Sequence, residues 1–259
     1  MTTSPFEAVL AWDEPLGLAP RGTVIVLPGR GERPGVYERF GRRLAADSYR
    51  VRVVRDATED VDEVARRISA LLAAPYTVGP VVLAGSDTGA LMALRTLLTG
   101  ADVAGVVLAG LPDPDRETAV AEDAEPELRA SCPTHQKLLA DSERGLFVAG
   151  TLTTARIPSE LRDPVDLTGV SVPVLAVHGA NDQVSPLAHA VRRYSDLPRV
   201  QLAAIEDGRH DVLNAAHHRT VAATVVLWLE QLRLGANAGP IARTVDLASF
   251  TETRELSPT

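Results

Sequence analysis

Residues 80–98 read PVVLAGSDTGALMALRTLL, in which an apolar run, a glycine-bounded turn and a helical repeat follow one another directly. The run Pro80–Ala84 is short and continuous, which predicts a strand buried on both faces. The stretch Gly89–Leu98 has apolar residues at helical spacing and opens from a glycine. The turn between them therefore joins a buried strand to a helix and displays Asp87 at its centre.

The same alternation of strand and helix patterns continues along most of the chain. Short apolar runs bounded by Gly, Pro or Asp alternate with longer stretches of helical period, which predicts an α/β fold with a mostly parallel central sheet flanked by helices. The expected strands are Phe6–Trp12 as a weaker edge strand, Thr23–Leu27, Val51–Val54, Pro80–Ala84, Val103–Ala109, Pro173–His178 and Val200–Ile205. The other expected helices are Val61–Ala74 and His217–Leu234, the latter with Val221, Val225, Leu227, Trp228 and Leu232 against the sheet.

Two regions break the alternation. Residues 111–168 are rich in Asp, Glu and Pro and weakly helical at Pro126–Arg144, so we expect a small inserted cap within a core formed by residues 1–110 and 169–236. Residues 237–259 have little periodicity, which predicts an extended or disordered tail. Apolar residues of the cap are expected to form a pocket wall for a moderately hydrophobic small molecule: Leu138, Leu139, Leu146, Phe147, Val148, Leu152 and Ile157.

Composition narrows the classes of function. The net charge of −8 and the scattered basic residues oppose nucleic-acid binding. No apolar run approaches the roughly 18 residues of a membrane span, and residues 1–10 lack a signal-peptide pattern, so we expect a cytoplasmic protein. The lone Cys132, the absence of metal-ligand spacing and the absence of a nucleotide fingerprint predict no metal and no cofactor.

The turn around Asp87 has the Gly-x-nucleophile-x-Gly spacing of a nucleophile elbow, with Gly85 and Gly89 supplying the small flanking residues. Asp182 and His210 follow the next two predicted strands, in the chain order nucleophile, acid, histidine. Carboxyl ends of strands are where open α/β sheets bind ligands. Each residue also has a structural alternative: an ordinary turn, a helix cap and a solvated loop histidine. Together the three predict a catalytic constellation.

Residues 26–37, VLPGRGERPGVY, are followed by RRLAA at 42–46 and, much later, by GRHDVLN at 208–214. With the elbow and the Asp182 loop, they resemble the motifs of the α/β-hydrolase superfamily, specifically its monoacylglycerol lipase and lysophospholipase-like branch. The resemblance implies an α/β-hydrolase fold. It also implies an oxyanion hole formed by the backbone N–H groups of Arg30 and Thr88. Two departures are Pro28, where the branch has histidine, and Asp87, where it has serine.

The Arg30 side chain is a candidate functional group. Its guanidinium group is expected either to lie near Asp87, lowering the pKa of that carboxyl group, or to receive an anionic substrate. The structural alternative is that Arg30 is a solvated loop residue.

An aspartate at the elbow directs the chemistry away from simple ester cleavage. A carboxylate that attacks an sp3 carbon forms an alkyl-enzyme ester, which water activated by His210 then hydrolyses. This chemistry resembles that of haloalkane dehalogenases and epoxide hydrolases, yet Thr88 replaces the dehalogenase tryptophan and no tyrosine lies in the expected cap. We therefore predict a hydrolase of small molecules, acting by covalent or base catalysis.

Three alternatives remain open. The first is ester cleavage, either by Asp87, which would form a high-energy mixed anhydride, or by Ser86, which is displaced from the apex of the turn. Asp87 and His210 could instead catalyse a non-hydrolytic reaction, such as elimination or C–C bond chemistry, as an acid and base pair. A chain without turnover that only binds a ligand is the third alternative.

Overall fold

The computed structural model describes residues 10–113, 116, 118–162, 166–235 and 237–242. Within them, seven strands form one sheet in the order β1-β3-β2-β4-β5-β6-β7, and only β1 runs antiparallel to its neighbour. The predicted α/β architecture with a mostly parallel sheet is therefore confirmed. The strands are β1 Leu10–Trp12, β2 Gly22–Leu27, β3 Tyr49–Val53, β4 Val81–Ser86, β5 Gly105–Ala109, β6 Val174–Gly179 and β7 Val200–Ile205.

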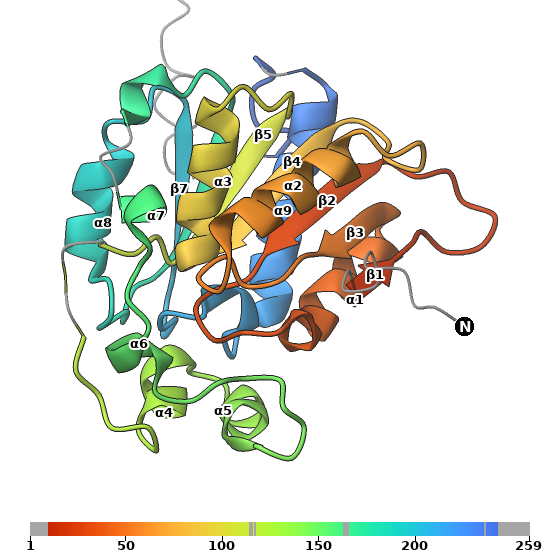
Figure 1. Cartoon of the computed structure of the whole chain (residues 1–259). Coiled ribbons are helices and arrows are strands. Elements are labelled where there is room, and N and C mark those ends of the chain that lie inside the picture. The colour runs from red at the N-terminus through yellow and green to blue at the C-terminus, as the bar shows by residue number, and fades with distance from the viewer. Residues whose placement is uncertain (1–9, 114–115, 117, 163–165, 236, 243–259) are drawn as a thin grey trace, which may run out of the picture.

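Helices cover both faces of the sheet (Figure 1). Helices α2, α3 and α8 pack on one face, and α1 and α9 pack on the other, so the apolar core has two layers separated by the sheet. Their bounds are α1 Glu38–Ala46, α2 Val61–Leu72, α3 Thr88–Leu98, α8 Leu187–Tyr194 and α9 His218–Arg233. In α9, Val221, Val225, Trp228 and Leu232 are buried as predicted, whereas Leu227 is 56% exposed and does not face the sheet.

Most strand predictions are correct to within two residues. Strand β4 extends past the predicted end at Ala84, because Gly85 and Ser86 continue the pairing with Leu108 and Ala109 of β5. The expected edge strand is confirmed at Leu10–Trp12, which pairs with β3, while residues 6–9 lie outside the described part of the chain. Most of the expected tail, residues 243–259, also lies outside it.

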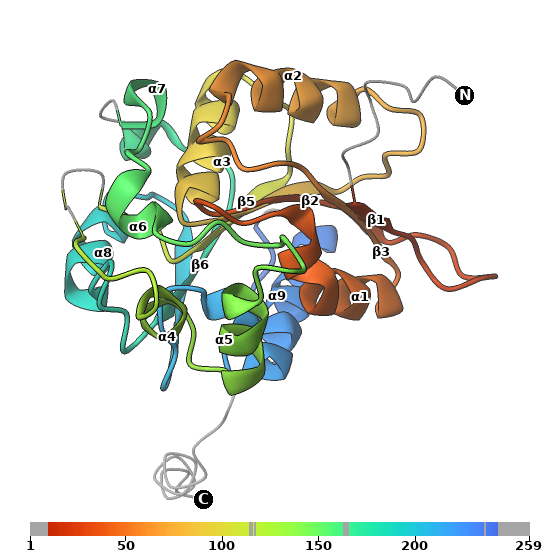
Figure 2. The same ribbon diagram turned by 60° about the horizontal axis from the view of Figure 1, so that its bottom comes forward.

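Residues 111–168, called the inserted segment below, connect β5 to β6. Their helices are α4 Glu125–Arg129, α5 Pro133–Ala140, α6 Thr151–Thr154 and α7 Ser159–Arg162. The predicted helical stretch Pro126–Arg144 is thus interrupted before Pro133, because residues 130–132 leave the helical conformation. Helices α4, α5 and α6 lie below the sheet in Figure 1, on the side of the strands' carboxyl ends, and Figure 2 turns this side toward the viewer. That the inserted segment acts as a cap stays a prediction.

No helix of the described residues is long and apolar enough to cross a membrane.

Candidate active site

Asp87 occupies a strained turn between β4 and α3. Its φ angle is +48°, a backbone conformation that residues with a side chain rarely adopt, and its N–H donates to the carbonyl oxygen of Ala109 at 3.1 Å. A Cβ atom on Gly89 would lie 2.0 Å from the carbonyl oxygen of Leu27, and one on Gly85 would lie 2.2 Å from that of Gly89. Both glycines are therefore required by close backbone contact, as the elbow spacing predicts.

Three polar residues from distant parts of the chain meet at this turn. Asp182 Oδ2 lies 2.9 Å from His210 Nδ1, and His210 Nε2 lies 3.2 Å from Asp87 Oδ1. The backbone N–H groups of Val184 and Ser185 donate to Asp182 Oδ1 at 2.8 and 2.9 Å and fix that carboxylate. Asp182, His210 and Asp87 thus form a continuous line of buried side chains, each no more than 5% exposed.

The Arg30 side chain binds the Asp87 carboxylate through two parallel contacts. Arg30 Nε donates to Oδ2 at 2.8 Å and Nη2 donates to Oδ1 at 2.9 Å, while the Arg30 backbone N–H also donates to Oδ2 at 3.0 Å. This confirms the prediction that the guanidinium group lies near Asp87. His210 Nε2 has no partner in hydrogen-bond geometry among the described residues, so its 3.2 Å contact with Asp87 Oδ1 is an ion pair. Asp87 Oδ1 already accepts a hydrogen bond from Arg30 Nη2.

These contacts set the charges of the site. Burial alone would raise the pKa of Asp87, but Arg30 and then His210 outweigh it and hold that pKa well below its usual range. Burial alone would lower the pKa of His210, but the carboxylates of Asp182 and Asp87 raise it to about 10. His210 and Arg30 are therefore cations at neutral pH, and Asp87 and Asp182 are anions. The four charges cancel.

The raised pKa of His210 predicts a stability that falls at alkaline pH. The stabilising contribution is complete below the ordinary value of 6.5 and is lost as the pH rises through about 10. We expect the free energy of unfolding to fall by about 3 kcal/mol between pH 6.5 and pH 9, because each pH unit in this interval costs about 1.4 kcal/mol. Chemical denaturation at both pH values measures it.

The matched control is His210→Gln, which has no titrating ring and should lose much less stability over the same interval. Equal losses in wild type and variant would contradict the assigned charge of His210. The lowered pKa of Asp87 acts at the other end of the range, where its contribution is lost as the pH falls from 3.8.

The two N–H groups implied as an oxyanion hole flank Asp87. The Arg30 N–H is occupied by Asp87 Oδ2 itself. Thr88 is the first residue of α3, is fully buried, and its Oγ1 atom has no hydrogen-bond partner among the described residues. Ser86, the neighbour on the other side, is 2% exposed at the end of β4. It does not take part in the line formed by Asp87, His210 and Asp182.

A second buried polar cluster, centred on Arg129 of α4, adjoins the first. Arg129 Nη2 donates to the carbonyl oxygen of Arg30 at 2.9 Å, and Nε donates to Glu125 Oε1 at 2.8 Å. Arg129 Nη1 lies 3.6 Å from Asp211 Oδ1 and 3.8 Å from Glu32 Oε1. The inserted segment therefore holds the loops that carry Arg30 and His210 through one fully buried guanidinium group.

The acidic members of this Arg129 cluster differ in the direction of their pKa shifts. Burial and the nearby Asp211 carboxylate raise the pKa of Glu32 well above its ordinary value. Burial would also raise the pKa of Asp211, but His135 and Arg129 outweigh it and lower that pKa. The Tyr37 hydroxyl donates to Glu32 Oε2, which also accepts the Gly29 N–H at 3.0 Å. These bonds fix the loop that ends at Arg30.

The sequence analysis did not identify several of these neighbours. Glu32 and Asp211 each lie within two residues of a predicted site residue, and this proximity is a signal that could have found them. Arg129 has no such signal, because it lies in a stretch without a motif. His178, expected to pack in the core, is fully buried and its Nε2 also lies 3.2 Å from Asp182 Oδ2.

The apolar residues expected to form one pocket wall are divided between two cavities and a small core. Of the seven residues, only Leu152 and Ile157 line the cavity that reaches Arg30. Leu139 and Phe147 pack with Ala130 in a small separate core, because the inserted segment has to bury apolar surface of its own. Two of the others, Leu146 and Val148, line a different cavity of about 440 Å³.

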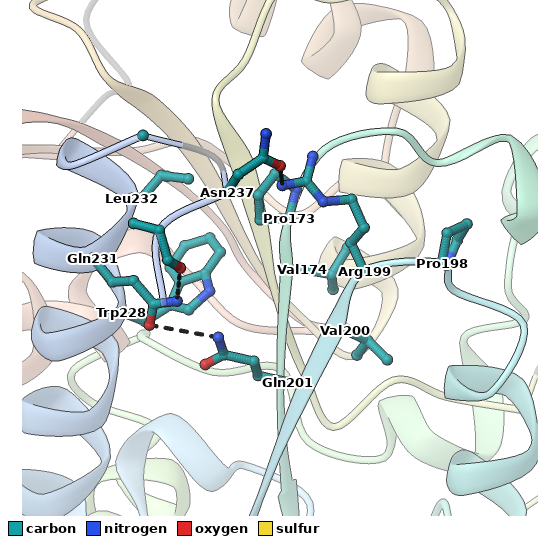
Figure 3. Close-up of a pocket in the computed structure, with 12 residues that line it drawn as sticks. Pro173, Val174, Pro198, Arg199, Val200, Gln201, Trp228, Gln231, Leu232 and Asn237 are labelled. Atoms are coloured by element: carbon teal, nitrogen blue, oxygen red, sulfur yellow. Dashed lines mark hydrogen bonds between the residues drawn. The ribbon is translucent and has the colours of Figure 1, made fainter. Parts of the chain in front are cut away.

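Another cavity, of about 320 Å³, lies at the opposite end of the sheet (Figure 3). It opens where β6 and β7 begin, at Val174 and Val200, and Gln231 Nε2 donates to the carbonyl oxygen of Ala238 beside it at 2.7 Å. Asp182 and His210 follow the other ends of these strands, so this cavity is separate from the candidate active site. Among the described residues, no three His, Cys, Asp or Glu side chains form a group that could hold a metal ion.

Comparison with known proteins places the fold. No protein-family model matches the chain, and no curated protein sequence matches it significantly. A soluble variant of monoglyceride lipase from Saccharomyces cerevisiae superposes with a TM-score of 0.69, at 15% identity over 86% of this chain and 91% of that one. A monoacylglycerol lipase from Paleococcus ferrophilus gives a TM-score of 0.65, at 17% identity over 86% and 98% of the two chains.

A third structure, an alpha/beta hydrolase enzyme from a lagoon-sediment metagenome, gives a TM-score of 0.61 at 17% identity over 86% and 94% of the two chains. The chain therefore has the α/β-hydrolase fold. This confirms the fold that the sequence motifs predict and the resemblance to monoacylglycerol lipases on which the prediction rests.

Proposed function

We propose that this protein is a hydrolase of small molecules in which Asp87 is the nucleophile, His210 the base that activates water, and Asp182 the residue that orients His210. The observation that carries the proposal is that the two carboxylate oxygens of Asp87 have different partners. Oδ2 is held by the Arg30 backbone N–H at 3.0 Å, while Oδ1 lies 3.2 Å from His210 Nε2. Oδ2 is held by a backbone donor and is placed to bear charge, whereas Oδ1 contacts only the side chains of Arg30 and His210 and is placed to react once the Arg30 side chain moves.

The first step requires a free Asp87 oxygen. Both oxygens are bound by the Arg30 side chain in the structure, so this guanidinium group has to move before Oδ1 attacks. Attack on an sp3 carbon forms a C–O bond, releases the leaving group with its electron pair, and leaves Asp87 as an alkyl ester. Asp87 then carries no charge. The pKa of His210 falls as a result, because one of the two carboxylates that raise it is gone.

The second step is hydrolysis of the ester. His210 first loses its proton to solvent and then, as the neutral base, accepts one proton from water while the hydroxide oxygen attacks Cγ of Asp87. The bond from Cγ to the former Oδ1 breaks, and the product leaves as an alcohol that carries this oxygen and the second proton of the water. Negative charge develops on Oδ2, which the Arg30 N–H already contacts. The proton on His210 is stabilised by Asp182 and by the regenerated Asp87 carboxylate, which restores the charges of the resting site.

A screen tests this proposal. Wild type is incubated with panels of alkyl halides, epoxides, lactones and activated esters, and turnover is measured. The His210→Gln variant is incubated with the same compounds and its intact mass is recorded. We expect turnover of an alkyl halide or epoxide by wild type and a substrate-derived mass increase on Asp87 in the variant. Turnover by wild type without any adduct in the variant would contradict a covalent intermediate.

The charged His210 favours a second candidate, a non-hydrolytic reaction. An imidazolium ion 3.2 Å from a carboxylate is an acid and base pair, which suits elimination or C–C bond chemistry without a covalent intermediate. The same mass measurement separates the two candidates, since this one predicts no adduct. Absence of turnover with every compound would support a protein that only binds its ligand.

Substitution of Arg30 tests its effect on Asp87. Arg30→Gln keeps the backbone N–H and removes the guanidinium group, which is the largest charge that lowers the pKa of Asp87. We expect the acid limb of the kcat/KM profile to move upward by at least about one pH unit, because burial then raises that pKa unopposed. Arg66→Gln, on the exposed face of α2, is the control. An acid limb that does not move would show that the ion pair between Arg30 and Asp87 does not control the pKa of Asp87.

A further inference from the structure

A cavity of about 260 Å³ connects Arg30 with the inserted segment. Apart from Arg30, its lining belongs entirely to residues 116–162 and includes three more arginines, Arg116, Arg156 and Arg162. Its volume lies just below the usual range of ligand sites, which starts at about 300 Å³. The cavity therefore suits a small molecule that contacts Arg30.

The described lining of the cavity is positively charged. Its lining contains four guanidinium groups and, among the described residues, no carboxylate. Arg116, Arg156 and Arg162 are exposed, and within the described ranges none of them forms an ion pair with an acidic side chain. Like charges around one small space repel one another, so the arrangement favours an anion between them.

Arg30 links this space to the elbow. Its Nε and Nη2 atoms bind Asp87, whereas Nη1 has no hydrogen-bond partner in the described part of the chain. Because Arg30 also lines the cavity, an anion bound there competes with Asp87 for the same guanidinium group. Such competition supplies the movement of Arg30 that the first reaction step requires.

The shape of guanidinium groups and the rest of the lining define the ligand class. A planar guanidinium donates two parallel N–H bonds to a carboxylate or a phosphate, and Leu152 and Ile157 add apolar surface. We propose that this cavity binds the anionic head, a carboxylate or a phosphate monoester, of a small substrate with a short hydrocarbon chain. The proposal rests on the function proposed above and names its substrate class.

Binding of product-like probes tests the proposal without turnover. The full chain is titrated calorimetrically with butyrate, butyl phosphate and neutral butyramide. We expect one of the two anions to bind at a single site with a millimolar or lower Kd and butyramide to give no heat. The double variant Arg156→Gln/Arg162→Gln should weaken anion binding at least about tenfold, because two charge-assisted contacts are lost. Arg66→Gln should bind like wild type.

Competition for Arg30 gives a second readout. Asp87→Asn releases the guanidinium group and should tighten anion binding by about tenfold, a typical coupling between two sites. Asp182→Asn removes the same charge without a contact to Arg30 and is the matched control. Tighter binding in the first variant and not in the second supports the proposal.

Four results would overturn it: binding of neither anion, anion binding that the double variant leaves unchanged, equal tightening by Asp87→Asn and Asp182→Asn, or turnover confined to uncharged substrates. The outcome is separate from that of the proposed function. Turnover confined to uncharged substrates would uphold the function and reject the anion site, whereas anion binding with no turnover of any compound would do the reverse.

Discussion

Asp87→Asn is expected to lower kcat/KM by at least about 10⁴-fold on any substrate that wild type hydrolyses, because an amide cannot act as the nucleophile. The substitution keeps the size of the side chain, so the strained turn at φ +48° is retained. It leaves the buried Arg30 guanidinium without its anion, and a thermal unfolding curve is needed to show that the variant is folded. Steady-state kinetics on the folded variant provide the measurement.

The companion variant is Asp87→Ser, which introduces the serine that the resembled sequence motif has at this position. It should lose turnover of alkyl halides and epoxides as Asp87→Asn does, since neither variant has a carboxylate. Residual activity within about tenfold of wild type in both variants would show that Asp87 is not the nucleophile.

Arg129→Met is expected to cost about 3–5 kcal/mol of unfolding free energy, the usual result of removing one partner from a buried ion pair. Arg129 is fully buried and is the only guanidinium group within 4 Å of Glu32, Glu125 and Asp211 among the described residues. Its loss leaves acidic groups in the interior without a cation, and a carbonyl oxygen of Arg30 without its donor. Chemical denaturation measures the change.

The control is Arg66→Met, an exposed position on α2 where a change within about 0.5 kcal/mol is expected. A loss below about 1 kcal/mol for Arg129→Met would contradict the account of the cluster as the connection between the inserted segment and the core. Because the cluster holds the Arg30 loop, we also expect lower turnover from the variant at temperatures where it is fully folded.

Local features of the sequence predict much of the sheet and the elbow. Buried parallel strands are short continuous apolar runs, so β2, β4, β5 and β6 are evident within two residues. Gly85 and Gly89 mark the turn because any side chain there would meet the backbone. Asp182 and His210 are found because the ends of parallel strands share one edge of a sheet.

The packing of the inserted segment could not be predicted in the same way. Its helices are short, so their apolar periodicity is too brief to separate residues that face a pocket from residues that pack among themselves. Leu139 and Phe147 illustrate this, since both pack in a small local core. Arg129 is missed because a buried arginine is defined by partners from distant parts of the chain, here Glu32 and Asp211.

The nucleophilic role of Asp87 is tested most directly by following the oxygen of water through one turnover. Excess enzyme is mixed with a compound that wild type hydrolyses, in water labelled with ¹⁸O, and the product and the peptide that contains Asp87 are analysed by mass spectrometry. The proposed mechanism predicts an unlabelled product and one ¹⁸O atom in the Asp87 carboxylate. A labelled product together with an unlabelled Asp87 would contradict it, because water would then have attacked the substrate directly.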